Sequence, residues 1–164
     1  MTGRVPTGRP AARPVLQGPL VVDTNVALDL LLFDDPATRG LARLLECAAV
    51  SWLATAAMRD ELRRVLTYRP IAARLLSQGQ DAAGVLLQFD RISQLREAPA
   101  PAAIRCSDRD DQPFIDLAVA HRAVLLSKDR AVLRLHRRLL GVGAGAWSPR
   151  ADWPAPPVAP APDY

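Results

Sequence analysis

Short apolar runs alternate along this chain with longer segments in which apolar residues recur at helical spacing. The runs at 19–23, 50–54, 123–126 and 145–148 have the length and composition of strands, and 93–96 has the pattern of a further short one. Helical patterns fill the segments between them. Strands that alternate with helices predict an α/β fold with a parallel sheet and right-handed crossovers.

The first of these runs ends in polar residues. Asp23, Thr24 and Asn25 follow directly on the apolar residues 19–22, and a helical pattern then begins. The carboxyl ends of parallel strands form the edge where ligands and metals bind, so Asp23 is predicted to lie at a site. Alternatively, Asp23 or Thr24 is only the N-cap of the next helix, and this stretch by itself leaves both interpretations open.

Three further acids occur at comparable junctions. Asp129 follows the strand at 123–126, Asp111 begins the helix before that strand, and Glu61 borders the apolar face of a helix over 55–68. Four carboxylates in one cleft repel one another, so they require protons or a metal. Oxygen ligands without a nearby His or Cys favour Mg²⁺ or Mn²⁺, which polarise a phosphate and activate water.

Four motifs, in this order and spacing, resemble those of the PIN domain, and in particular its branch of toxin components of toxin–antitoxin systems. They are Val-Asp-Thr-Asn-Val at 22–26, Asp-Glu-Leu at 60–62, the acidic run that starts at 108, and Ser-Lys-Asp at 127–129. The resemblance implies a three-layer α/β/α sandwich with a central parallel sheet. It also implies a ribonuclease site that depends on Mg²⁺ or Mn²⁺.

The resemblance assigns roles residue by residue. Asn25 and Ser127 take the outer-shell positions that orient ligands or water, and the residues in the catalytic and metal-binding positions are Asp23, Glu61, Asp111 and Asp129. A metal ion held by these acids would activate water to attack the RNA phosphate.

The third acid of this set has several candidates. We choose Asp111 because it precedes Asp129 by 18 residues and Phe114 by three, as in similar family members. Asp108 is expected to shape the loop, and Asp110 to be exposed. Asp116 replaces the small apolar residue that is commonest there, and it is either a further outer-shell acid or a solvated helix residue.

A group of arginines follows Asp129. Arg130, Arg134, Arg137 and Arg138 fall on one stripe of a helix predicted over 130–140. The stripe is either a solvated face or a track that binds RNA phosphates. The net charge of +4 and the pI of about 9.8 weakly favour an anionic partner.

The 164 residues suffice for one domain with a substantial core. We predict that 18–149 form the PIN-like domain, that 1–17 are a disordered arm and that 150–164 are a disordered Pro/Ala-rich tail. Two cysteines make no disulfide framework, so the expected compartment is the reducing cytoplasm. Polar residues interrupt the apolar stretch 15–33, and no membrane span is expected.

The leading hypothesis is therefore a metal-dependent endoribonuclease that hydrolyses RNA and serves as a toxin. The resemblance also suggests an antitoxin partner and a homodimer. The alternative is a non-catalytic PIN-like module that binds RNA or protein. The chain does not specify the RNA target, the cleavage sequence or the number of metal ions.

Overall fold

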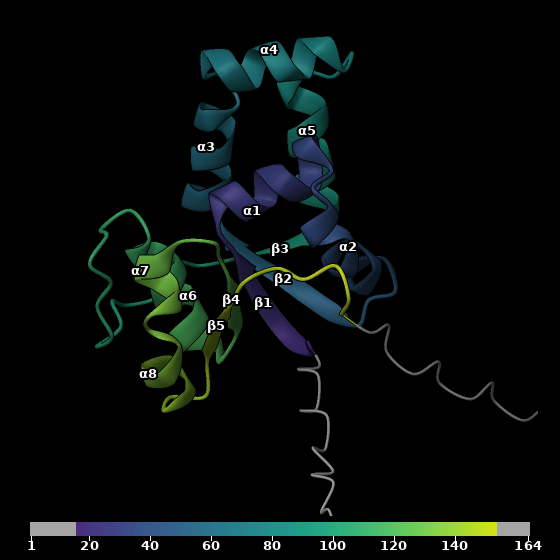
Figure 1. Cartoon of the computed structure of the whole chain (residues 1–164). Helices are drawn as coiled ribbons and strands as arrows, with labels where there is room; N and C mark the ends of the chain where they lie inside the picture. Colours follow the sequence, from purple (N-terminus) through teal and green to yellow (C-terminus); the bar gives the residue numbers. More distant parts are fainter. Residues whose placement is uncertain (1–15, 154–164) are drawn as a thin grey trace, which may run out of the picture.

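Five parallel strands form a single sheet in the order β3-β2-β1-β4-β5 in this computed structural model, which describes residues 16–153. The predicted parallel sheet is confirmed (Figure 1). The disordered arm and tail were predicted at 1–17 and 150–164, and of these segments residues 1–15 and 154–164 lie outside the described residues. The strands are β1 (Gly18–Val22), β2 (Val50–Thr55), β3 (Ser93–Arg96), β4 (Val124–Leu126) and β5 (Gly145–Trp147).

Helices connect all the strands and cover both faces of the sheet, which confirms the α/β sandwich. The strand order advances in one direction from β1 to β3 and in the other from β3 to β5, so right-handed crossovers place the two sets of helices on opposite faces. The helical elements are α1 (Thr24–Leu28), η1 (Asp29–Phe33), η2 (Pro36–Thr38), α2 (Arg39–Glu46), α3 (Ala56–Val65), α4 (Arg69–Ser77), α5 (Ala82–Ile92), α6 (Gln112–His121), α7 (Arg130–Leu133) and α8 (His136–Leu140).

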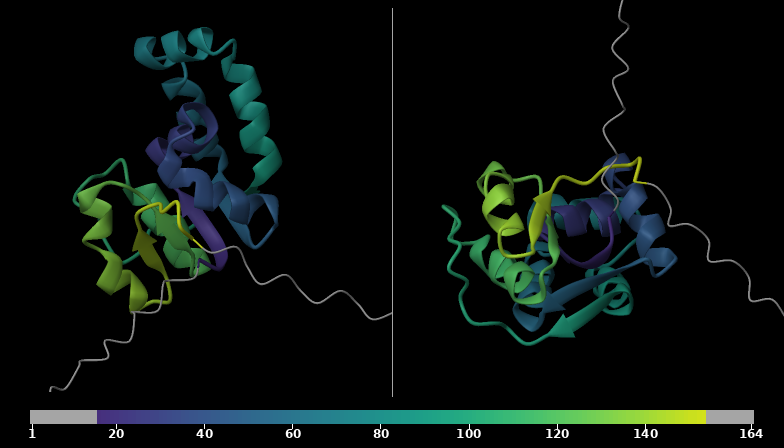
Figure 2. Two further views of the ribbon diagram at one scale, coloured as in Figure 1. Left: turned by 45° about the vertical axis from the view of Figure 1, so that its right-hand side comes forward. Right: turned by 90° about the horizontal axis from the view of Figure 1, so that it is seen from below.

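The first half of the chain adds a helical projection. Helices α3 and α5 extend beyond the sheet, and α4 crosses their far end (Figure 1, Figure 2). The contact between α3 and α5 is direct, and η1 packs against α5. Within residues 16–153, no helix combines the length and apolar character needed to cross a bilayer.

Strand β1 occupies the centre of the sheet. Its residues Leu20, Val21 and Val22 are buried, as expected for a strand covered on both faces. The Asp23 backbone N–H donates to the Leu126 carbonyl at 3.0 Å, so the carboxyl ends of β1 and β4 lie side by side. The strand order reverses between these two strands, where α/β proteins typically bind ligands.

The single helix predicted over 130–140 is wrong. Instead, α7 ends at Leu133, and α8 begins at His136. The Leu135 N–H donates to the Val132 carbonyl, three residues back, which tightens the turn and ends α7. The arginines predicted to share one helical stripe therefore lie on two short helices and the turn between them.

The described chain is packed at both ends. Leu16 and Trp153 are each 2% exposed, although they lie outside the predicted domain limits of 18 and 149. After β5 the chain crosses the sheet to reach α2 (Figure 1). There Arg43 Nη2 donates to the Ala151 carbonyl at 2.8 Å, and Gly40 leaves no room for a side chain beside the Arg150 carbonyl.

Trp153→Ala should lower the free energy of unfolding by about 3–5 kcal/mol, because it removes a fully buried aromatic ring and leaves a cavity. Denaturant unfolding of the full chain measures this change. Leu76→Ala, at a side chain that is 79% exposed on α4, is the control and should change the stability by less than about 0.5 kcal/mol. A loss no larger than the control's would show that Trp153 is not part of the core.

Candidate metal centre

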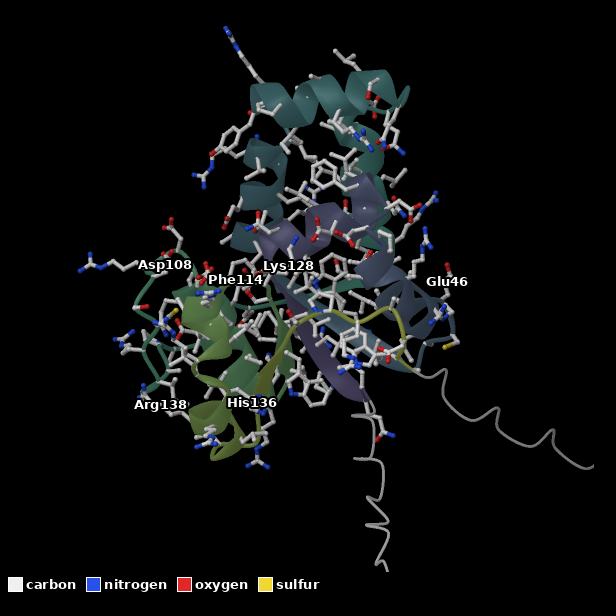
Figure 3. The ribbon with its side chains drawn as sticks, in the orientation of Figure 1. Glu46, Asp108, Phe114, Lys128, His136 and Arg138 are labelled. Atoms are coloured by element: carbon white, nitrogen blue, oxygen red, sulfur yellow. The ribbon has the colours of Figure 1, made fainter. Side chains whose placement is uncertain are left out.

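An acidic cleft of about 230 Å³ opens at the carboxyl ends of β1 and β4. Asp108 and Phe114 lie near each other at this side of the molecule (Figure 3). Four separate elements or loops supply carboxylates to the cleft. Its lining residues are Asp23, Thr24, Asn25, Glu61, Val65, Asp108, Asp110, Asp111, Phe114 and Asp129.

Asp23 is both the N-cap of α1 and a wall of the cleft. Its Oδ1 accepts the Val26 N–H at 2.8 Å, and its side chain is hydrogen-bonded to Ser127. Burial raises the pKa of Asp23, while the hydrogen bonds and the Lys128 charge oppose this rise. The two interpretations of this residue are therefore compatible, because one carboxylate oxygen caps the helix.

Ser127 connects two of the acids. The residue is fully buried, and its Oγ accepts the Asp129 backbone N–H at 3.0 Å. The same side chain hydrogen-bonds to Asp23, so one hydroxyl ties the end of β1 to the start of α7. Asp129 then caps α7 through the Ala131 N–H, at 2.7 Å from its Oδ1.

Asp111 has a buried carboxylate oxygen that is not satisfied. Its Oδ2 is buried and has no hydrogen-bond partner among the described residues. Burial, followed by the negative charges of Asp129, Asp108, Asp23 and Asp110, raises the pKa of Asp111 to about 6. A buried acceptor without a donor costs free energy, and a bound cation would remove that cost.

Asp108 lies closer to Asp111 and Asp129 than the sequence indicated. One carboxylate oxygen from each of Asp108, Asp111 and Asp129 lies within 4.8 Å of the other two. Asp108 Oδ1 also accepts the Asp110 N–H at 2.9 Å, so it shapes the loop as predicted. The sequence could not show that Asp108 lies with Asp111 and Asp129, because the shape of the loop decides which acid of this run turns inward.

Glu61 and Asn25 reach the cleft from two helices. Glu61 is half-buried on α3, which Thr55 caps by accepting the Met58 N–H at 3.3 Å. Asn25 is exposed on the first turn of α1. Both residues line the cleft, whereas their predicted roles in metal binding stay predictions.

Asp116 does not line the cleft, and the outer-shell role that was one of its two predicted alternatives stays a prediction. Its Oδ1 accepts the Ala102 N–H at 2.9 Å and the Gln112 Nε2–H at 2.8 Å. Gln112 in turn bonds to the Ile104 carbonyl and the Cys106 N–H. Asp116 therefore fixes the loop before α6, a long-range contact that helical spacing cannot reveal.

An ion pair beside the centre was not predicted. Lys128 Nζ contacts Asp29 Oδ2, and the Asp29 side chain is only 11% exposed. The sequence held two signals, since Lys128 is the only lysine in the chain and Asp29 interrupts an apolar helical pattern. Neither signal identifies the other residue as its partner.

The donor set fits a hard divalent cation. Asp23, Asp108, Asp111 and Asp129 offer carboxylate oxygens, and within the described part of the chain no His or Cys lines the cleft. The buried, unpartnered Oδ2 of Asp111 is the structural observation that favours a ligand here. These residues would hold the ion, with Glu61 facing the same cleft.

Asp111→Asn should raise the melting temperature of the chelator-treated protein at about pH 7.5. The folded pKa of about 6 lies above the ordinary 3.8, so the contribution of Asp111 to stability is complete below about pH 3.8 and is lost as the pH rises through 6. The gain from the amide should therefore disappear towards about pH 4. Asp60→Asn, at an exposed acid on α3, is the control; an equal gain at both pH values would contradict the raised pKa.

Comparison with known proteins agrees with this geometry at the level of the family. No curated protein and no solved structure gave a significant match. A family model described as PIN domain matches residues 19–131, which include β1 from its second residue, β2 to β4, every acid of the cleft and the start of α7. The match covers more than half of the 164 residues, and the chain therefore belongs to the PIN domain family.

Proposed function

We propose that this protein is a divalent-metal-dependent endoribonuclease, with Mg²⁺ or Mn²⁺ as its cofactor. The observation that carries the proposal is the buried, unpartnered Oδ2 of Asp111 within a cluster of converging carboxylates. A module that only binds RNA gains nothing from acids that repel both one another and the RNA phosphates. A nuclease uses the same acids to hold the cation that compensates the phosphate charge.

The residues of the chain have separate tasks in this proposal. Asp23, Glu61, Asp111 and Asp129 hold the ion, which supplies phosphate polarisation and water activation when it is bound. Asp108 joins them as a fifth acid, because its carboxylate lies with those of Asp111 and Asp129.

Two polar residues assist the acids in the proposed site. Ser127 fixes the separation of Asp23 and Asp129 through its buried hydroxyl. Asn25, exposed at the cleft, would orient water or substrate. Hydrolysis would leave a 5′ phosphate on one RNA product.

The arginines after Asp129 are proposed to bind the RNA backbone. Arg130, Arg134, Arg137 and Arg138 are all exposed. The first of them starts α7 directly after Asp129, which lines the cleft, while α8 lies at the other end of α7 (Figure 1). The break between these helices corrects the shape of the track from a straight stripe to a bent one, and its phosphate-binding role rests on charge and position.

We further propose that the protein is the toxin of a toxin–antitoxin system, with an antitoxin partner, a homodimeric state and a cytoplasmic location. The resemblance of the four sequence motifs supports the first three proposals. The two cysteines, Cys47 and Cys106, are free thiols, which is compatible with a reducing compartment.

Asp23→Asn should abolish most RNA cleavage in the presence of Mn²⁺. Removing one coordinating charge costs several kcal/mol, so the expected loss in rate is about 100-fold or more. A gel-based cleavage assay measures the rate. RNA binding in chelator should not weaken, since the amide removes a negative charge from the cleft.

The exposed acid next to Glu61 supplies the control. Asp60→Asn should cleave RNA like the wild type, because Asp60 pairs with Arg63 on the surface and does not line the cleft. Activity of Asp23→Asn within about threefold of the wild type would exclude Asp23 from catalysis. No shift in melting temperature when Mn²⁺ is added to the wild type would favour the non-catalytic module.

The double variant Arg134→Ala/Arg137→Ala should weaken RNA binding and reduce its salt dependence. For single-stranded RNA, log K falls with log salt, and each phosphate contact adds about 0.7 to the steepness of this fall. Each lost contact therefore makes the plot less steep by that amount. We expect a reduction equivalent to roughly one or two contacts, with little change in the rate at saturating RNA.

A matched pair of arginines far from α7 serves as the comparison. Arg64→Ala/Arg69→Ala removes the same charge from exposed positions on α3 and α4. If both double variants change the salt slope equally, the arginines after Asp129 only contribute to the overall charge.

A further inference from the structure

One loop carries the two acids whose carboxylates lie with that of Asp129. Asp108 and Asp111 belong to the segment between β3 and α6, which contains no helix or strand. Within the described part of the chain, residues 102–108 make no backbone–backbone hydrogen bond. Ile104 is the only residue from 97 to 111 that is buried overall. The position of the two acids therefore depends on side chains that bind this loop.

Gln112, the first residue of α6, binds the loop through its side-chain amide. Its Oε1 accepts the Cys106 N–H at 2.8 Å, and its Nε2 donates to the Ile104 carbonyl at 3.0 Å. Nε2 also donates to Asp116 Oδ1 at 2.8 Å. The amide thus uses both its donors and its acceptor. A carboxylate of the same size would keep only the bond to Cys106, because it has no proton to donate.

Asp116, one turn further along α6, extends this set of contacts. Its Oδ1 accepts the Ala102 N–H at 2.9 Å in addition to the Gln112 amide. The two side chains together bind the loop backbone at residues 102, 104 and 106. Asp108 follows the last of these contacts by only two residues, so these contacts limit where its carboxylate can lie.

The other end of the loop leads directly to Gln112. The residue before it is Asp111, whose buried Oδ2 has no hydrogen-bond partner among the described residues. One carboxylate oxygen of Asp111 lies within 4.8 Å of one from Asp108 and one from Asp129. Asp129 is held separately, through the Ser127 hydroxyl at the end of β4. The spacing of the three oxygens therefore depends on how the loop is held relative to the sheet.

Divalent cations differ in how strictly they require such spacing. Mg²⁺ needs nearly ideal octahedral geometry with oxygens at about 2.0–2.1 Å, whereas Ca²⁺ accepts flexible arrangements at about 2.3–2.6 Å. Carboxylates on a loosely held loop could still surround Ca²⁺. They would satisfy Mg²⁺ less well, because each departure from the required geometry weakens its binding.

We propose that Gln112 is a positioning residue of the metal centre, whose side-chain amide holds Asp108 and Asp111 at the spacing that favours Mg²⁺ over Ca²⁺. The inference rests on the proposed function in one respect, because it takes the acidic cleft as a metal site. Gln112 does not line the cleft, so it acts only through the backbone that it binds.

Calorimetric titration of the chelator-treated full chain with Mg²⁺, and separately with Ca²⁺, tests the proposal. Gln112→Met removes the amide and keeps the length of the side chain. It should weaken Mg²⁺ binding about tenfold or more, the size of change typical for outer-shell residues. The Ca²⁺ affinity should change by less than about threefold. A general loss of stability would instead weaken both cations by the same factor, since only the folded protein binds them.

Gln88→Met is the matched control, because Gln88 is exposed on α5 and does not line the cleft. It should leave both affinities unchanged. Melting curves in chelator identify any variant that fails to fold. If Gln112→Met fails, Gln112→Glu replaces it, because the carboxylate still accepts the Cys106 N–H. Its added negative charge would by itself strengthen the binding of both cations, so weaker Mg²⁺ binding by this variant is not a charge effect.

The outcomes separate this inference from the proposed function. An unchanged preference for Mg²⁺ over Ca²⁺ in the Gln112 variant overturns the inference alone, whether the two affinities stay the same or fall equally. Failure of the wild type to bind either cation overturns both the metal site and the inference. A selective loss of Mg²⁺ affinity supports Gln112 as the residue that sets the spacing of the loop acids.

Discussion

Repulsion among carboxylates at the ends of buried strands is the constraint on which this site depends. Asp23 ends the central strand and is 5% exposed, so water does little to stabilise its charge. The chain offers it the Val26 N–H and the Ser127 hydroxyl, while Asp111 keeps an oxygen for which residues 16–153 supply no donor. Repulsion within such a cluster is unfavourable, and a bound divalent cation would offset it.

Much of the sheet could be predicted because short apolar runs in the sequence mark its strands. Apolar runs that end in an acid identified β1 and the end of β4, and thereby Asp23 and Asp129. Their adjacency depends on the strand order, which no local pattern contains. Glu61 was included in the predicted cleft from its place at the border of an apolar helical face. The family resemblance then gave it a catalytic position, because a single acid at such a border has no distinctive spacing.

The parts that could not be predicted are contacts between distant segments. Asp116 was predicted to be either an outer-shell acid or a solvated helix residue, and it accepts the Ala102 N–H across a loop. Trp153 lies in the segment predicted to be a Pro/Ala-rich tail, yet it is buried in the core. In each case the residue type was visible, whereas its partner is specified only by the three-dimensional arrangement.

Four acids of the cleft are held in position in two different ways. Asp23 is held by the sheet, and Asp129 is joined to it through the Ser127 hydroxyl, so their separation follows from strand pairing. Asp108 and Asp111 instead belong to the loop before α6, which Gln112 and Asp116 anchor. The carboxylates on the sheet side therefore have fixed positions, whereas those on the loop side depend on a few side-chain hydrogen bonds. Asp116 thus contributes to the site by fixing the backbone that carries Asp111, although its own carboxylate lies outside the cleft.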